Sequence, residues 1–127
     1  MPDSLTIAKT CASHAEEMQA EDIIVLDLRG ISSLADFFVI CTATSLPHLK
    51  AVNREIRGKT EDSIGEKPRS SEGDADSMWL VIDYVDVVVH VFHEEKRNLY
   101  ALEDLWSDAP RIELEFEEKS ASDTSAH

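Results

Sequence analysis

The chain has 127 residues, and 12 lysines and arginines stand against 26 aspartates and glutamates, which gives a formal net charge of −14. This length predicts one domain whose core needs no disulfides. The charge argues against a general nucleic-acid-binding surface and against docking on an anionic membrane, and it favours a basic partner. Cys11 and Cys41 lack CxxC spacing, no stretch approaches the ~20 apolar residues of a membrane span, and the N-terminus lacks a signal layout. We therefore expect a cytoplasmic protein with two free thiols.

The first half of the chain predicts two helices and two buried strands. Leu5, Ala8, Ala12 and Ala15 recur at helical spacing, and Asp3 or Ser4 can cap that helix. The strands are expected at residues 23–28 and 37–41, because both runs are almost unbroken apolar. A second helix follows, with an N-cap at residues 44–45, Pro47 in its first turn, and a buried stripe formed by Leu49, Val52 and Ile56.

The second half predicts a loop, a hairpin, a helix and an edge strand. Residues 65–77 have loop composition, and residues 80–82 and 87–91 form two strands around a tight connection. A third helix should start at His93 and run to a stop at Pro110, and the strict alternation of residues 111–116 predicts a half-exposed edge strand. We expect residues 1–116 to form one α/β (α+β) domain with a mixed five-stranded sheet, and residues 117–127 to be a disordered polar tail.

Three carboxylates could line one end of the sheet, namely Asp27, Asp83 and Asp86. Carboxylates on neighbouring strands hold Mg²⁺ in nucleotide-transferring folds, but the chain has no glycine-rich phosphate loop beside them. Asp83 and Asp86 can also be turn residues that bond their own backbone. A divergent nucleotide-binding enzyme therefore stays open as an alternative to a binding module.

Other reactive side chains have simpler interpretations. Residues three apart on a strand point to opposite faces, so His90 and His93 should not share a metal. We expect His90 to be hydrogen-bonded and partly buried, with a contact role as the alternative. Cys41 lacks a clear base, and Ser45 is better explained as a helix cap than as a nucleophile.

Half of the basic residues lie between Lys50 and Arg69. Lys50, Arg54 and Arg57 share one face of the second predicted helix. They are either a solvated face paired with Glu55 and Glu61 or a local contact with phosphate or an acidic partner.

Four of the chain's eight aromatic residues are Trp79, Tyr84, Tyr100 and Trp106, and all four lie within or just after the hairpin. Core packing is the simpler explanation for Tyr100 and Trp106. Trp79 at a strand start and Tyr84 in the turn are harder to bury, and exposed aromatics beside charges are typical of binding hot spots.

Several segments together resemble the ribosomal silencing factor family, also called Iojap-like. The resemblance runs from about residue 23 to residue 114, and it is carried by these stretches: Leu26-Asp27-Leu28-Arg29-Gly30, Ser33-Leu34-Ala35-Asp36-Phe37-Phe38-Val39-Ile40, Trp79-Leu80-Val81-Ile82-Asp83-Tyr84, Asp86-Val87-Val88-Val89-His90-Val91-Phe92-His93, and Tyr100 to Pro110.

The resemblance implies a nucleotidyltransferase-like fold without a catalytic site, and hence no enzyme activity and no cofactor. It implies binding to large-subunit ribosomal protein fourteen on the large ribosomal subunit, which sterically blocks joining of the small subunit and represses translation. It also implies a homodimer for some members, and it allows a minor ribosomal RNA contact through Lys50, Arg54 and Arg57. The contact residues expected in the hairpin and the following helix are Trp79, Tyr84, Asp86, His90, Arg97 and Tyr100.

Two positions depart from the family pattern. Val85 and Ala43 stand where glycine is usual. If the glycine at position 85 serves a positive φ, valine there should be strained.

Overall fold

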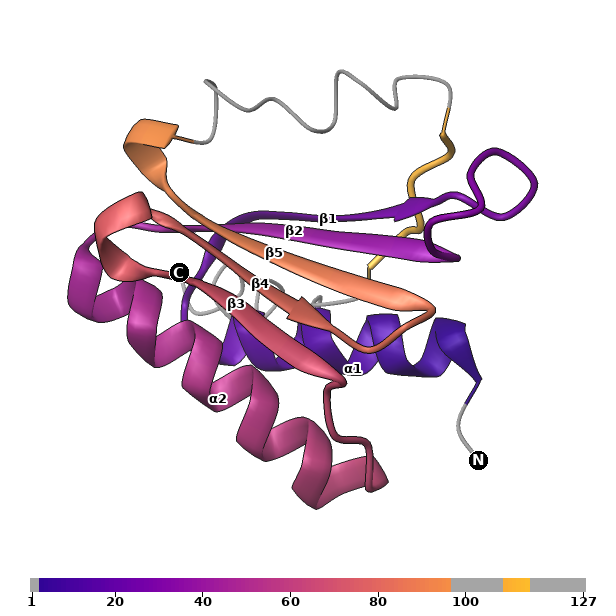
Figure 1. Ribbon diagram of the computed structural model, residues 1–127, viewed down its shortest axis with the longest axis horizontal. Coiled ribbons are helices and arrows are strands. Elements are labelled where there is room, and N and C mark those ends of the chain that lie inside the picture. The colour runs from indigo at the N-terminus through magenta and orange to yellow at the C-terminus, as the bar shows by residue number, and fades with distance from the viewer. Residues whose placement is uncertain (1–2, 97–108, 115–127) are drawn as a thin grey trace, which may run out of the picture.

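The computed structural model describes residues 3–96 and 109–114, which form one layer of helices on a mixed sheet (Figure 1). The elements in chain order are α1 (Ser4–Glu17), β1 (Glu21–Asp27), β2 (Phe37–Ala43), α2 (Leu46–Ile64), β3 (Ser70–Asp74), the 3₁₀ turn η1 (Ala75–Ser77), β4 (Trp79–Asp83) and β5 (Val87–His93). The five strands lie in the order β1-β2-β5-β4-β3, with β2 and β5 parallel and the other neighbours antiparallel. The predicted α+β fold with a mixed five-stranded sheet is confirmed.

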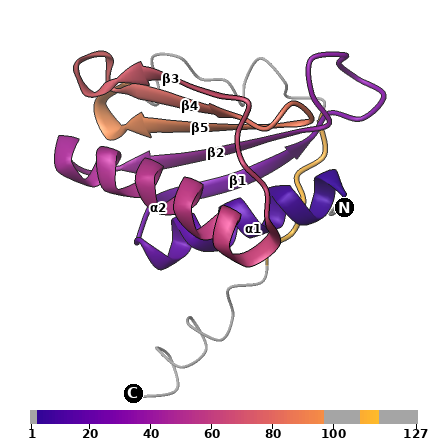
Figure 2. The same cartoon turned by 60° about the horizontal axis from the view of Figure 1, so that its bottom comes forward.

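Both helices begin where the sequence predicts them. The Asp3 carboxylate accepts a hydrogen bond from the Thr6 N–H at 2.9 Å, and the Ser45 hydroxyl accepts one from the His48 N–H at 3.1 Å. Gly65 ends α2 with a φ of 74°, a conformation that glycine adopts without steric cost. Figure 2 shows α1 and α2 side by side against the same face of the sheet. No helix among residues 3–96 and 109–114 is long and apolar enough to cross a bilayer.

The central strands β2 and β5 are buried on both faces, which explains their continuous apolar runs. The face toward the helices carries alternate residues of each strand, such as Val39 and Val89, and it packs on Cys11 and Ile56. The opposite face carries a second apolar cluster, which consists of Leu26, Leu28, Ala35, Phe38, Ile40, Phe92 and Ala109.

The identity of the fifth strand differs from the prediction. It is β3, which lies in the segment predicted as a loop and pairs with β4 from Ser70↔Asp83 to Asp74↔Trp79. The five residues of β3 include no strong strand former, so pairing with β4 overrides local propensity. Gly73 permits this pairing, because its φ is 91° and an added Cβ would collide with the Trp79 carbonyl oxygen.

The prediction of an edge strand at residues 111–116 is wrong for residues 111–114, which are the part that the structure describes. Residues 111–114 form one isolated bridge, Arg111↔Leu26, and Ile112 donates its N–H to the Val25 carbonyl at 2.8 Å. Residues 115 and 116 and the predicted tail lie outside the described residues.

The third helix can be checked only at its start. His93 is the last residue of β5 rather than the first of the helix, and residues 94–96 are helical. The rest of this predicted helix, including Arg97 and Tyr100, lies outside the described residues.

Candidate functional site

The β4–β5 turn is held by three short hydrogen bonds. The Tyr84 N–H donates to the Val87 carbonyl at 2.8 Å, and the Asp86 N–H donates to the Tyr84 carbonyl at 3.0 Å. The Val85 N–H donates to the Asp83 carboxylate at 2.7 Å. Asp83 therefore bonds the backbone two residues on, as predicted for a turn residue.

Val85 stands in a backbone conformation that suits glycine. Its φ is 79°, and the hydrogen bond between its two neighbours closes a γ-turn with positive φ, which is a strained form. The expected strain at the family's usual glycine position is confirmed. Ala43 carries no such cost, because it is a buried residue of β2 and is not among the positive-φ residues.

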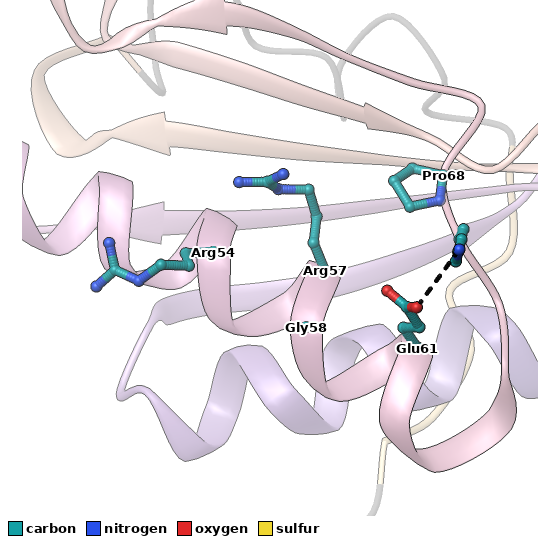
Figure 3. A pocket seen from close by; sticks show the side chains of 6 residues that line it. Arg54, Arg57, Gly58, Glu61 and Pro68 are labelled. Atoms are coloured by element: carbon teal, nitrogen blue, oxygen red, sulfur yellow. Dashed lines mark ion pairs between the residues drawn. The ribbon is translucent and has the colours of Figure 1, made fainter.

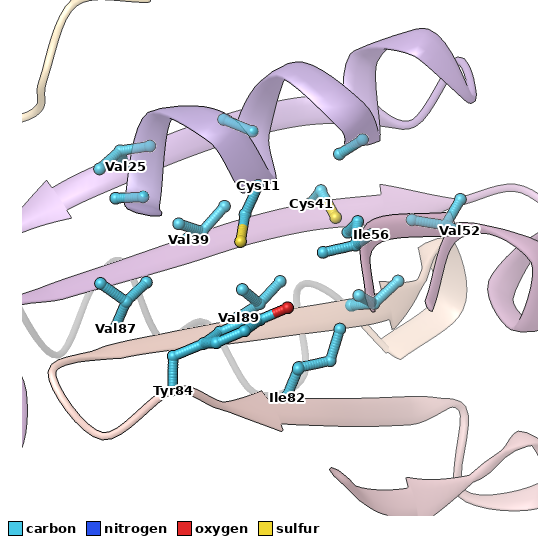
Figure 4. Packing of buried hydrophobic residues seen from close by; sticks show 14 of the residues in the cluster. Cys11, Val25, Val39, Cys41, Val52, Ile56, Ile82, Tyr84, Val87 and Val89 are labelled. Carbon is cyan, nitrogen blue, oxygen red and sulfur yellow. The ribbon is translucent and has the colours of Figure 1, made fainter. Parts of the chain in front are cut away.

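Tyr84 is buried, which contradicts the expectation that the turn would leave it exposed. Only 5% of the residue is accessible, and its ring packs among Val89, Ile82 and Cys11 (Figure 4). The physical reason is the strand alternation: Leu80, Ile82 and Tyr84 all point toward the helices. Burial raises the pKa of the Tyr84 phenol, so the hydroxyl stays protonated.

Trp79 and His90 form an aromatic group on the opposite face of the sheet. The Trp79 Nε1–H donates to His90 Nδ1 at 3.2 Å, and the Trp79 ring stacks on Phe92 with centroids 5.2 Å apart. The His90 and Phe38 rings form a T-shaped contact, with their centroids 4.6 Å apart. The prediction that His90 is hydrogen-bonded is confirmed, the residue is buried where only partial burial was predicted, and this burial lowers its pKa to about 4.

His90 does not share a metal site with His93. His93 Nδ1 accepts a hydrogen bond from the Glu95 N–H at 3.1 Å, which occupies that nitrogen locally. Within residues 3–96 and 109–114, no three His, Cys, Asp or Glu side chains are placed to hold a metal ion together.

One end of the sheet exposes apolar side chains that the sequence reasoning missed. Leu34 is 70% exposed, Val85 48% and Ile31 44%, and these are the exposed large hydrophobic residues of the described chain. The β1–β2 loop and the β4–β5 turn meet at this end, where the Asp36 N–H donates to the Asp86 carbonyl at 2.7 Å (Figure 1). The available sequence signal for these exposed residues was the presence of two large apolar residues, Ile31 and Leu34, in a loop segment that otherwise contains Ser, Gly and Asp. We call Ile31, Leu34, Val85 and the exposed Asp86 the sheet-end patch.

The three candidate catalytic acids lie at one end of the sheet but do not converge. Asp27 on β1 and Asp83 on β4 are separated by β2 and β5, which places the two strands roughly 14 Å apart at ~4.8 Å per step. In two-metal sites the two metal ions lie only about 4 Å apart, so the carboxylates that hold them must lie much closer together than these two strands do. The prediction that these acids face one end is confirmed, but the spacing does not form a shared Mg²⁺ site.

Two of these acids instead form ion pairs with arginine side chains. The Asp27 carboxylate accepts two hydrogen bonds from Arg29, which lower the pKa of Asp27. Burial raises the pKa of Asp83, but hydrogen bonds from the Arg69 guanidinium at 2.7 Å and the Val85 N–H outweigh it, and the pKa is lowered. Arg29 also lies over the Phe37 ring, 4.9 Å from its centroid.

Both cysteines are free and buried, as predicted. Burial raises the pKa of the Cys11 thiol to about 12, so almost no thiolate forms at neutral pH. Cys11 is a core residue in contact with Thr60, with Sγ and Oγ1 3.7 Å apart.

Comparison with known proteins shows the family to which this chain belongs. The family described as "Ribosomal silencing factor during starvation" matches residues 1–127. The chain belongs to the ribosomal silencing factor family. Among its relatives are the ribosomal silencing factor of Bacillus subtilis, 41% identical over 87% of this chain and 93% of that protein, and the one of Halalkalibacterium halodurans, 42% identical over 86% and 92%.

The chain is also similar to a plant protein and to proteins of known structure. The chloroplastic protein Iojap of Arabidopsis thaliana is 35% identical over 93% of this chain and 49% of its own length. A crystal structure of a Chromobacterium violaceum protein superimposes with a TM-score of 0.77 at 29% identity, over 84% of this chain and 88% of that one. A Bacillus halodurans crystal structure gives a TM-score of 0.74 at 34% identity, over 87% and 100%. The resemblance found in the sequence to the ribosomal silencing factor family is thereby confirmed, and it assigns the chain a regulatory role at the ribosome.

Proposed function

We propose that this protein binds the large ribosomal subunit at ribosomal protein fourteen and sterically prevents the small subunit from joining. The observation that carries the proposal is membership of the ribosomal silencing factor family over the full chain. The charge of −14 supports it, because ribosomal proteins are generally basic and opposite charges speed encounter. The mechanism needs no bond to be made or broken, so the protein acts as a cytoplasmic repressor of translation rather than an enzyme.

The contact surface that we propose has two parts. The first is the sheet face opposite the helices, where Trp79 is half-buried and His90 supports it through a hydrogen bond. The second is the sheet-end patch, which offers exposed apolar side chains and the exposed carboxylate of Asp86 to a basic protein surface.

Three of the contact residues predicted from the sequence, Tyr84, Arg97 and Tyr100, are not among the residues that define these two parts of the surface. Tyr84 supports the turn from inside the core instead of touching the partner. Arg97 and Tyr100 remain proposed contacts from the segment after β5.

Secondary contacts are also part of the proposal. Lys50 and Arg54 are exposed and Arg57 is half-buried on α2, and we propose them as a minor contact to ribosomal RNA phosphates. A homodimer, as the family resemblance implies for some members, is also proposed.

The test is co-sedimentation of the purified protein with separated large and small subunits, followed by subunit joining in the same tubes. We expect binding to the large subunit alone, with fewer joined ribosomes. Leu34→Ala, Asp86→Ala and Trp79→Ala should each weaken binding by about fivefold or more, the usual effect of losing a hot-spot side chain. Lys9→Ala on the exposed side of α1 is the matched control and should bind as the wild type does. Binding to neither subunit would refute the proposal.

A further inference from the structure

A hollow of about 360 Å³ lies between the middle of α2 and the segment that leads into β3 (Figure 3). Its lining consists of Arg54, Arg57, Gly58, Glu61, Lys67 and Pro68. This volume is at the lower end of the range for small-ligand sites, which is room for a charged group and a small organic body. The protein contacts proposed at the sheet-end patch and at Trp79 do not use this hollow, although Arg54 and Arg57 are also proposed as secondary contacts to ribosomal RNA.

The charge of the lining is opposite to that of the chain. Three cations and one carboxylate give a net charge of +2 on a protein whose total is −14. The expected pairing of this helix face with Glu55 and Glu61 does not include the arginines, because Glu55 pairs with Lys59 at 3.3 Å and Glu61 with Lys67 at 3.7 Å. Within the described part of the chain, Arg54 and Arg57 therefore make no ion pair, although acids outnumber bases by more than two to one.

Arg57 is already positioned. Its Nε donates to the Oδ1 of Asn53 at 2.9 Å, and Asn53 is buried, with only 6% of its surface accessible. This bond fixes the guanidinium from one side and leaves its two terminal nitrogens for a second acceptor. A fork of two N–H donors matches two oxygens of a phosphate, and less entropy is lost when the fork is held in advance.

The rest of the lining leaves space for that acceptor. A Cβ added at Gly58 would meet nothing within 4 Å, so the surface above this helix position is open. The Lys67–Glu61 pair is exposed, with 73% and 49% of the side chains accessible, and such a pair exchanges partners at little cost.

We propose that this hollow binds a phosphomonoester group, such as the terminal phosphate of a nucleotide. A phosphomonoester carries a charge of about −1.5 to −2 at neutral pH, which balances the lining, whereas a phosphodiester of RNA carries only about −1 per phosphate. Arg57 supplies the fork, and Arg54 and Lys67 supply further positive charge in the lining. The proposal does not rest on ribosome binding.

The experiment is calorimetric titration of the full-length protein, without Mg²⁺ and at fixed ionic strength. The probes are adenosine 5′-monophosphate, adenosine, and the dinucleoside phosphodiester ApA. We expect saturable binding of the monophosphate, none of adenosine, and weaker binding of ApA. Arg54→Gln and Arg57→Gln should each weaken the monophosphate by about tenfold or more, since each removes charge-assisted hydrogen bonds. Lys50→Gln, on the same helix but outside the lining, is the matched control and should bind as the wild type does.

Three results would overturn the proposal. One is no saturable binding of the monophosphate, and another is an equal loss in Lys50→Gln and Arg57→Gln, which would indicate a general charge effect. The third is ApA binding as tightly as the monophosphate, which would assign the site to RNA phosphodiesters. Binding of the same variants to the large subunit is measured in parallel. It shows whether a failure of phosphate binding is independent of a failure of the silencing function.

Discussion

The indole N–H of Trp79 donates to Nδ1 of His90, 3.2 Å away on the neighbouring strand. Because Nδ1 accepts this bond, the proton of the neutral imidazole sits on Nε2. Nε2 is buried and has no hydrogen-bond partner within the described residues. A protonated imidazole would place two N–H groups against each other at Nδ1, so the contact requires neutral His90.

The burial of His90 should make the protein sensitive to mild acid. The pKa of His90 is about 4 in the folded protein, below an unfolded value of ~6.5, so the unfolded state binds the proton more readily. Stability is therefore complete above about pH 6.5 and is lost as the pH falls toward 4, by roughly 3 kcal/mol in total. The measurement is the free energy of unfolding in urea at pH 4.5, 5.5 and 7.

His90→Gln should flatten that profile, because glutamine offers Trp79 an acceptor and does not titrate. His14→Gln removes a histidine from α1 instead and should keep the wild-type slope. A His90→Gln protein that loses as much stability between pH 7 and 4.5 as the wild type would show that His90 is not the group responsible.

Val85→Gly should stabilise the protein by about 1 kcal/mol. The positive φ of 79° costs a β-branched residue roughly 1–3 kcal/mol, and the added freedom of glycine in the unfolded chain offsets about 1 kcal/mol of the gain. Val85→Ala keeps a Cβ in the same conformation, so it separates backbone strain from side-chain loss and should gain less. Urea unfolding of the three proteins checks this, and a glycine variant no more stable than the alanine variant would contradict it.

Tyr84 variants should separate a core role from a contact role. Tyr84→Ala should cost about 3–5 kcal/mol, as expected when a large buried ring is removed. Tyr84→Phe should lie within about 1 kcal/mol of the wild type, because the hydroxyl approaches Cys11 and Thr60 without good hydrogen-bond geometry. We also expect Tyr84→Phe to bind the large subunit normally. Weaker binding with unchanged stability would place the hydroxyl in the interface.

Apolar periodicity and capping residues were sufficient to predict α1, α2 and four of the strands. They failed at β3, because Ser70–Asp74 has no strand-forming pattern and exists only through pairing with β4. The alternation Leu80, Ile82, Tyr84 could have placed Tyr84 in the core, but the turn chemistry of Asp83 and Asp86 outweighed it.

The candidate site was predictable only in part. The acids were correctly assigned to one end of the sheet, but their separation depends on strand order, which puts β2 and β5 between Asp27 and Asp83. The sheet-end patch needs two connections that are distant in sequence to meet, and no local pattern encodes the Asp36–Asp86 bond that joins them.

The same strand order predicts how the chain responds to Mg²⁺ and nucleotide. If Asp27, Asp83 and Asp86 formed a metal site, Mg²⁺ with ATP would raise the melting temperature and Asp83→Asn would abolish the rise. We expect Asp83→Asn to leave any nucleotide-dependent rise intact, because Asp83 is occupied by Arg69 and lies on a strand roughly 14 Å from that of Asp27. Arg57→Gln should remove the rise instead, with or without Mg²⁺. Thermal unfolding of both variants beside the wild type decides between them, and a Mg²⁺-dependent rise lost only in Asp83→Asn would restore the enzyme interpretation.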